Sequence, residues 1–128
     1  MSLFDQPFDT KRDAAIVTGA GNGIGRAIAQ ALVAQGVRTV FADVNADTVA
    51  AAVKASADPK LALAWTGDLA SQAECDRLLK EARAQFGHIN LFVHSASPPR
   101  KEKDHAMAVT SETWTQMRAV NLDAGFHL

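Results

Sequence analysis

The sequence has no tyrosine and only one cysteine, Cys75, in 128 residues. A single cysteine excludes an internal disulfide, which favours a reducing compartment, the cytoplasm. No apolar run approaches the roughly 20 residues of a membrane-spanning helix, and the first residues lack the apolar core of a signal peptide. The net charge of −1 gives no indication of a nucleic-acid or anionic-membrane partner. No spacing of His, Cys and Asp residues predicts a metal site. These absences predict a soluble, cytoplasmic protein.

Short apolar runs alternate with helical patterns after residue 12. The runs at 14–17, 39–44, 61–66 and 89–93 predict buried strands, with helices between them and after the last one. Strands that alternate with helices pair in parallel through right-handed crossovers. We therefore expect an α/β fold, a Rossmann-type doubly wound parallel sheet with strand order 3-2-1-4 and without the C-terminal strands of the usual six. Residues 1–12 are expected to form an N-terminal arm, and residues 13–128 a dinucleotide-binding portion that is truncated in its last helix.

Three of the helical patterns predict particular contacts. In the first helix, Ile24, Ile28 and Leu32 recur at helical spacing, with Ala27 and Ala31 beside them. In the third, Ser71 and Glu74 have the spacing of a capping box, in which each side chain bonds the other residue's backbone amide. The last helix is predicted to begin at Thr110 or Ser111 and to place one set of side chains on a common face: Trp114, Met117, Val120 and Ala124.

Four glycines stand at alternate positions in the stretch TGAGNGIG, between the first predicted strand and the first predicted helix. The exposed amides and the positive dipole end of a helix N-terminus attract an anion, and the close approach of a pyrophosphate requires residues without a Cβ. The spacing fits the pattern T-G-x-x-x-G-x-G at Thr18, Gly19, Gly23 and Gly25, with Ile24 between the last two. A glycine-rich turn without a ligand is the alternative interpretation.

This glycine spacing resembles the cofactor loop of the short-chain dehydrogenase/reductase family. Asp43, at the end of the second predicted strand, is placed to accept both ribose hydroxyls of an adenosine and to repel a 2′-phosphate. Asn22 in the loop is not basic, and no Lys or Arg directly follows Asp43, so NAD is predicted rather than NADP. The alternative is that Asp43 caps the next helix.

The resemblance covers nearly all of the chain after residue 12 and implies further site residues. Asp68 and Leu69, after the third strand, occupy the positions that touch the adenine ring in this family. Ser95 and Ala96, after the fourth strand, occupy positions whose backbone lines the nicotinamide ribose. Asn121 matches the asparagine that bends the last helix and holds a water of the proton relay. The plainer alternatives are a turn role for Asp68 and a solvated position for Asn121.

The sequence departs from the family pattern after the fourth strand. His94 to Ser97 read H-S-A-S, where the family usually carries N-N-A-G, so the asparagine that braces the central sheet is replaced. We interpret His94 as a structural residue rather than a catalytic base. Lys101 and Lys103, in the loop that follows, are interpreted as solvated charges.

The resemblance also implies chemistry that this sequence lacks. The family uses a tyrosine, a lysine four residues after it and a serine on a fifth strand to handle the substrate oxygen, and no tyrosine is present. We therefore expect the cofactor-binding half of a longer NAD(H)-dependent oxidoreductase that interconverts a secondary alcohol and a ketone. The 128 residues alone are expected to be inactive, and the full-length form to be a homo-oligomer.

Two other interpretations remain open. A stand-alone, non-catalytic dinucleotide-binding module would also lack the tyrosine. A Rossmann-like methyltransferase would use a similar glycine loop, but that fold places an acid before the first glycine, where Thr18 stands here.

Overall fold

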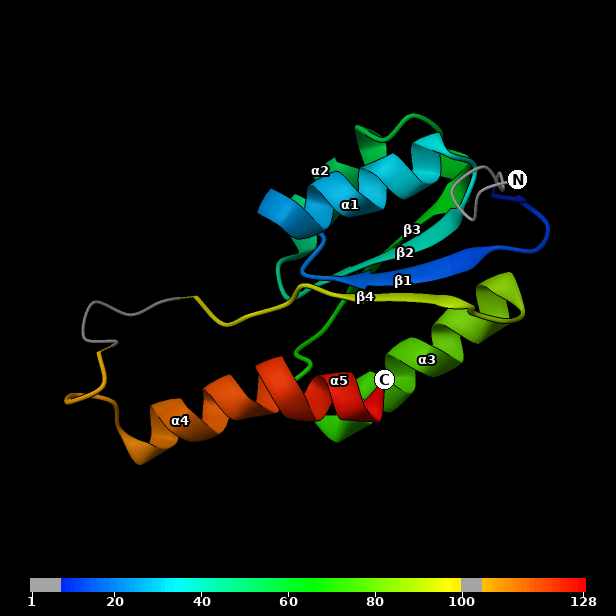
Figure 1. Ribbon diagram of the computed structural model, residues 1–128. Helices are drawn as coiled ribbons and strands as arrows, with labels where there is room; N and C mark the ends of the chain where they lie inside the picture. The colour runs from blue at the N-terminus through cyan, green and yellow to red at the C-terminus, as the bar shows by residue number, and fades with distance from the viewer. Residues whose placement is uncertain (1–7, 100–104) are drawn as a thin grey trace, which may run out of the picture.

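The computed structural model describes residues 8–99 and 105–128 (Figure 1). Its strands are β1 (Ala14–Thr18), β2 (Arg38–Asp43), β3 (Ala62–Thr66) and β4 (Leu91–His94). They are all parallel and lie in the order β3-β2-β1-β4, which confirms the predicted Rossmann-type sheet. Within the described residues β4 is an edge strand, because it pairs with β1 alone.

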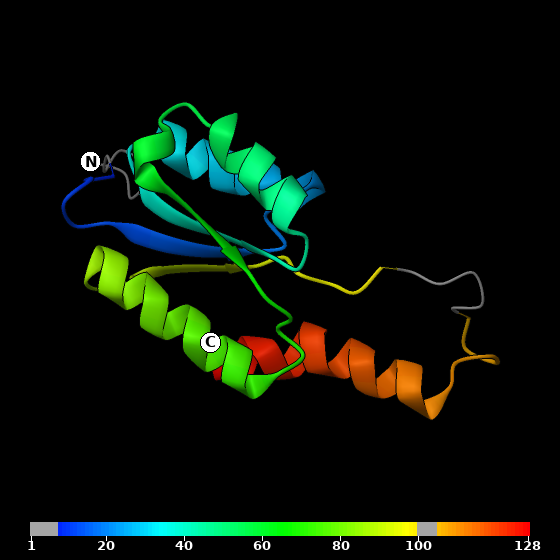
Figure 2. The ribbon, with the colours of Figure 1, turned by 180° about the vertical axis from the view of Figure 1, so that it is seen from behind.

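Helices cover both faces of this sheet (Figures 1 and 2). Helices α1 (Gly23–Ala34) and α2 (Ala46–Lys54) lie on one face, and α3 (Gln72–Phe86) lies on the other. A C-terminal helical segment lies on the same face as α3 and consists of α4 (Ser111–Arg118), the π-helical turn η3 (Ala119–Asp123) and α5 (Ala124–His127). A short 3₁₀ turn, η2 (Pro59–Leu61), leads into β3. None of the helices in the described ranges is both long and apolar enough to cross a membrane.

The core consists of two apolar layers, one on each face of the sheet. All five residues of β1 are buried, as expected for a strand between two neighbours. Successive side chains of a strand point to opposite faces, so Ile16 packs in the layer under α3 while Val17 packs in the layer under α1 and α2. This rigid double layer holds the carboxyl ends of β1, β2 and β4 at one edge, where Thr18 pairs with Ala42 and with His94.

The residues that helix α1 buries fully are not the isoleucines and the leucine that recur at helical spacing. Its buried residues are Gly25, Ala29 and Val33, whereas Ile24 is 76% exposed. The physical reason is the close approach of Gly25 to the backbone after β1, which turns this face of the helix toward the sheet. Ile28, in turn, is only half-buried, at the margin of the core.

The predicted capping box at the start of α3 is wrong. Ser71 is the N-cap residue, but its side chain makes no capping hydrogen bond with any described residue. Glu74 instead forms an ion pair with Arg77 at 2.6 Å. Arg77 also donates to the Thr66 carbonyl and lies over the ring of Trp65, 4.4 Å from the ring centroid. A charged partner one turn along the helix thus replaces the N-cap amide as the partner of Glu74.

The last helix also differs from its predicted face. Thr110 caps α4, and its hydroxyl accepts the Thr113 amide at 3.1 Å. Val120 and Ala124 are buried as predicted, but Trp114 is 64% exposed. The reason is visible in Figure 1, where α4 extends away from the sheet while η3 and α5 lie against α3.

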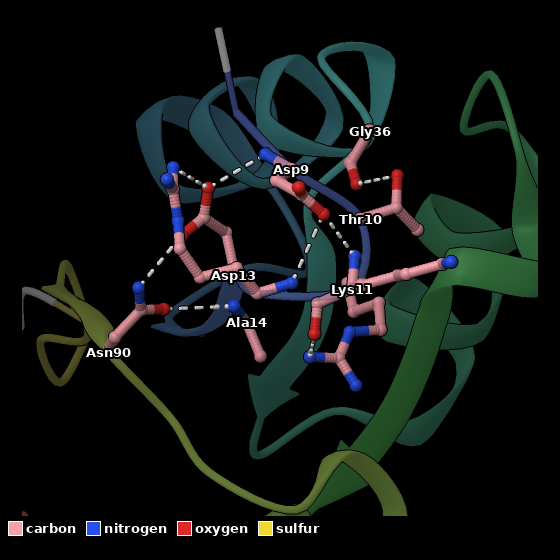
Figure 3. Close-up of polar contacts among 9 residues, drawn as sticks. Asp9, Thr10, Lys11, Asp13, Ala14, Gly36 and Asn90 are labelled. Atoms are coloured by element: carbon pink, nitrogen blue, oxygen red, sulfur yellow. Dashed lines mark hydrogen bonds and ion pairs between the residues drawn. The ribbon is translucent and has the colours of Figure 1, made fainter. Parts of the chain in front are cut away.

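A polar clamp joins the start of β1 to the start of β4 (Figure 3). Asp13, only 3% exposed, accepts hydrogen bonds from the Arg12 guanidinium, the Asp9 amide and the Asn90 side chain. These bonds hold the pKa of the Asp13 carboxyl well below its usual range, with Arg12 making the largest contribution. The Asn90 oxygen in turn accepts the Ala14 amide at 2.9 Å. The clamp fixes the sheet at the end opposite the glycine loop.

Candidate functional site

The loop after β1 packs directly against the loop after β4. Gly19 has φ +66°, a conformation that side chains rarely adopt, and a Cβ there would lie 2.8 Å from the backbone of Ser95 and Ala96. The structure therefore brings together the predicted residues of both loops at the carboxyl edge of the sheet. Only glycine permits this backbone contact at position 19.

Gly25 and Gly23 serve the loop in different ways. A Cβ on Gly25 would overlap the Gly19 carbonyl oxygen and would lie 2.7 Å from the carbonyl carbon, so this glycine lets α1 approach the loop. Gly23, with φ +56°, has no described atom within 4 Å of its Cβ position. The loop is thus tightly packed at Gly19 and Gly25 and open at Gly23. An open side of this kind at a helix N-terminus can accommodate an anion.

The start of α1 carries positive potential. Its N-cap residue, Asn22, makes no side-chain capping hydrogen bond to any described residue, and its first turn contains no acid. By contrast, Asn45 caps α2 by accepting the amides of Asp47 and Thr48, and Asp47 adds a negative charge there. Uncapped amides and a positive dipole end at α1 fit the pyrophosphate of a dinucleotide.

Asp43 lies beside the glycine loop, at the end of β2. Its Oδ2 accepts the Gly21 amide at 2.8 Å, and its Oδ1 accepts the Asn45 amide at 3.2 Å. A carboxylate has about four acceptor positions, so both oxygens retain capacity for ribose hydroxyls. The alternative of Asp43 as the cap of α2 is wrong, because Asn45 caps that helix.

Gly21 is a part of the site that the family pattern does not include. A Cβ at this position would lie 2.5 Å from the Thr48 hydroxyl and 2.8 Å from Asp43 Oδ2. The absence of a side chain therefore allows the loop amide to reach the carboxylate. The signal in the sequence was the additional glycine between Gly19 and Gly23.

Thr18 connects the ends of β1 and β4. Its hydroxyl oxygen accepts the amides of Ser95 and Ala96 at 3.0 and 3.1 Å, and it lies 2.8 Å from Nδ1 of His94. Nε2 of His94 lies 2.8 Å from the carbonyl oxygen of Val120, in η3. Both ring nitrogens are engaged, which supports the structural interpretation of His94 over that of a catalytic base.

The two residues predicted to contact adenine are placed differently. Asp68 is exposed, and its side chain accepts the Ala70 amide at 3.0 Å while its carbonyl accepts the Ser71 amide. Asp68 thus has the turn role that was the plainer alternative. Leu69 is 6% exposed and packs in the core layer under α3. Of the two, Asp68 remains accessible to a ligand.

Asn121 lies in the π-helical turn η3, half-buried, where the last helix leaves regular α geometry. The predicted distortion of the helix at this residue is thus present as a π turn, a feature that occurs frequently at functional sites. Cys75 is fully buried, and burial raises the pKa of its thiol, so it is no thiolate nucleophile. Lys101 and Lys103 lie outside the described residues.

Two further features lie apart from the glycine loop. A pocket of about 210 Å³ opens beside the edge strand β4 and is lined by Ile16, Leu79, Arg83, Ile89, Phe92 and Leu128 among others. In residues 8–99 and 105–128, no group of three or more His, Cys, Asp or Glu side chains is arranged to hold a metal ion.

Comparison with known proteins agrees with this geometry. The family model described as short chain dehydrogenase matches residues 13–128. An uncharacterized oxidoreductase of Mycobacterium bovis is 34% identical over 108 residues, which are 84% of this chain and 43% of that protein. A probable galactose dehydrogenase of Rhizobium meliloti is 33% identical over 125 residues, 95% of this chain and 48% of that protein. The chain thus spans about half the length of the curated relatives it matches.

Solved structures show the same fold. The crystal structure of a short-chain dehydrogenase/reductase from Brucella melitensis, named a glucose/ribitol dehydrogenase, superposes with a TM-score of 0.85 at 26% identity. The superposition covers 95% of this chain and 50% of that one. The glycine loop, the strand order and the family match lead to one conclusion: this chain belongs to the short-chain dehydrogenase/reductase family.

Proposed function

We propose that this chain is the NAD-binding half of an oxidoreductase that interconverts a secondary alcohol and a ketone. The observation that carries the proposal is the position of Asp43 beside the glycine loop, with one carboxylate oxygen on the Gly21 amide at 2.8 Å. A carboxylate held there accepts ribose hydroxyls and repels a 2′-phosphate. NAD is therefore favoured over NADP.

Each part of the loop has a defined task in holding the dinucleotide. The amides at the start of α1 bind the pyrophosphate, and Gly23 leaves their open side free of a side chain. Asp43 orients the adenosine ribose, and Asp68 borders the adenine. The backbone at Ser95 and Ala96, fixed by the Thr18 hydroxyl, borders the nicotinamide ribose. When bound, NAD⁺ would accept a hydride from the alcohol, and NADH would donate one to the ketone.

The 128 residues alone are proposed to bind NAD without turnover. The sequence contains no tyrosine to exchange a proton with the substrate oxygen, and a positioned acid or base typically contributes about 10²–10⁴-fold to such a step. Asn121 could order a water, but His94 has both ring nitrogens engaged. The substrate is proposed to be a small alcohol or carbonyl compound, handled by a longer, homo-oligomeric, cytoplasmic protein.

Calorimetric titration of the chain with NAD and with NADP tests the proposal. We expect NAD to bind more tightly than NADP. Asp43→Ala should weaken NAD binding by roughly tenfold and reduce the difference in affinity between NAD and NADP. Asp47→Ala is the matched control, because it removes a carboxylate at the start of α2 that forms no hydrogen bond or ion pair with the glycine loop among the described residues. Equal affinity for the two dinucleotides would overturn the cofactor assignment.

The same preparation tests the lack of turnover. The unaltered chain, incubated with NAD and a panel of secondary alcohols, is expected to form no NADH above background. Robust turnover that persists after rigorous purification would overturn the proposed lack of activity. A stand-alone binding module would also bind NAD without turnover. It differs from the proposed function only in that no catalytic half would accompany it.

A further inference from the structure

Four polar contacts join the end of β1, the end of β4 and the π turn, two of them made by the His94 ring and three by the Thr18 hydroxyl, which share the contact between these two side chains. The Thr18 hydroxyl oxygen accepts two amides, those of Ser95 and Ala96, at 3.0 and 3.1 Å. It lies 2.8 Å from Nδ1 of His94, and Nε2 of the same ring lies 2.8 Å from the Val120 carbonyl oxygen. These contacts connect segments that are far apart in the sequence.

The chemistry of the partners determines where the protons lie. A carbonyl oxygen can only accept, so Nε2 of His94 must carry a hydrogen and donate it to Val120. A hydroxyl has one donor and two acceptor lone pairs, and both lone pairs of Thr18 are taken by amides. The Thr18 hydroxyl hydrogen therefore points to Nδ1 of His94, which accepts it. The neutral Nε2–H tautomer satisfies all four contacts together.

The π turn explains why the Val120 carbonyl is available. The amide of Ala124 donates to the carbonyl of Ala119, five residues earlier, instead of to Val120 as in an α-helix. His94 supplies the donor that the Val120 carbonyl thereby loses. Packing also holds the ring in place, because Phe92 stacks on it at 5.9 Å between centroids and a Cβ on Gly125 would come within 3.4 Å of its Cδ2.

We propose that His94 is a positioning residue that, as the Nε2–H tautomer, holds the π turn carrying Asn121 at a fixed place relative to Thr18 and the glycine loop. The placement of the turn follows from the contacts alone. Its use, to present Asn121 beside the nicotinamide end of a bound cofactor, rests on the proposed function. His94 acts through hydrogen bonds to Thr18 and Val120 and takes no proton from a substrate.

Nitrogen NMR of the unaltered chain, with its histidines isotopically labelled, directly tests which ring nitrogen of His94 carries the hydrogen. The signals of His94 are assigned by their loss in His94→Asn, with His88, His105 and His127 as internal references. We expect a protonated Nε2 and an unprotonated Nδ1 for His94. A protonated Nδ1, or rapid averaging between the two tautomers, would overturn the proposal, and the assignment can be repeated with His94→Gln.

Two variants then test the contact of His94 with Thr18 and its contact with Val120 separately. In His94→Asn the amide oxygen can still accept from Thr18, but the side chain is too short to reach Val120. In His94→Gln the amide nitrogen reaches the place of Nε2 and can donate to Val120. We expect hydrogen exchange of the Ala124 amide to be roughly three- to tenfold faster in His94→Asn, as for the loss of one net hydrogen bond, and to be restored in His94→Gln.

His94→Met is the packing control, because methionine has about the length of glutamine but no amide group to donate to Val120. We expect the Ala124 amide to exchange as fast in His94→Met as in His94→Asn. Exchange in His94→Met as slow as in His94→Gln, or equal exchange in His94→Asn and His94→Gln, would overturn the positioning role. Neither measurement requires a cofactor, so the outcome is independent of the NAD titration. A chain that fails to bind NAD but shows the expected tautomer and exchange would contradict the proposed function and leave the role of His94 intact.

Discussion

Replacement of Gly25 by alanine is the sharpest test of how the glycine loop is built. The added Cβ would overlap the Gly19 carbonyl oxygen and would lie 2.7 Å from the carbonyl carbon and 3.2 Å from the Thr18 carbonyl oxygen. All three are backbone atoms: two belong to Gly19, directly after β1, and the third to Thr18, the last residue of this buried strand, which is paired on both sides. No flexible side chain can move to relieve the contact, so α1 or the loop must shift.

The expected cost follows from two opposing effects. Overpacking of a tight site typically costs about 1–3 kcal/mol, and a contact with fixed backbone belongs at the upper end of that range. Alanine gains about 1 kcal/mol over glycine inside a helix. We therefore expect Gly25→Ala to lower the free energy of unfolding by about 2 kcal/mol. NAD should bind roughly tenfold more weakly or worse, because the amides of the loop are displaced.

The matched control is Gly87→Ala. Gly87 ends α3 with φ +85° and has no described atom within 4 Å of its Cβ position, so alanine there meets backbone strain but no overlap. A side chain in such a sparsely populated backbone conformation costs about 1–3 kcal/mol. Gly87→Ala should therefore be destabilised to a comparable degree while it binds NAD normally. Comparison of Gly25→Ala with Gly87→Ala therefore distinguishes a change in the geometry of the glycine loop from a general loss of stability.

Urea unfolding, followed by tryptophan fluorescence, measures both free energies of unfolding. Trp65 is 3% exposed and reports on the core layer under α3. Calorimetric titration at a temperature where all three proteins are folded gives the NAD affinities. The reasoning is refuted if Gly25→Ala matches the unaltered chain in both stability and NAD affinity, because the loop would then have room that the structure does not show.

Three further predictions concern other parts of the chain. The folded-state pKa of Asp13 lies below the value of about 3.9 for an unfolded chain. The ionised carboxylate therefore stabilises the fold above about pH 3.9, and this stabilisation is lost as the pH falls from there toward the folded-state pKa. Urea midpoints between about pH 6 and pH 2.5 should thus fall less steeply in Asp13→Asn than in the unaltered chain, and parallel profiles would contradict the clamp. Asn90→Ala should cost about 1–3 kcal/mol at neutral pH, because it leaves the buried Ala14 amide without its acceptor; an unchanged urea midpoint would contradict this. Among the described residues β4 is an edge strand, and its Phe92 side chain is 42% exposed. The chain should therefore associate as its concentration rises in sedimentation experiments, and Phe92→Lys should suppress this association, whereas a monomer at every concentration would argue against it.

The fold, and the strand ends at which the candidate site is proposed, could be predicted from local patterns in the sequence. Strand and helix alternation reflects local backbone periodicity, and right-handed crossovers then leave few possible strand orders. The glycine spacing from Gly19 to Gly25 and the acid at Asp43 are local signals too, since each stands at the end of a strand. These features could be recognised because the residues that specify them are close together in the chain.

Which helix face is buried and which polar groups form hydrogen bonds depends on the packing of the folded chain. The face of α1 that is buried depends on the approach of Gly25 to the backbone of Gly19, which periodicity does not report. Asp13 meets Asn90 across 77 positions, and His94 reaches the Val120 carbonyl across 26. Hydrogen bonds over such separations depend on strand register and on the displaced bonding of a π turn. These are properties of the packed chain, and no short stretch of sequence contains them.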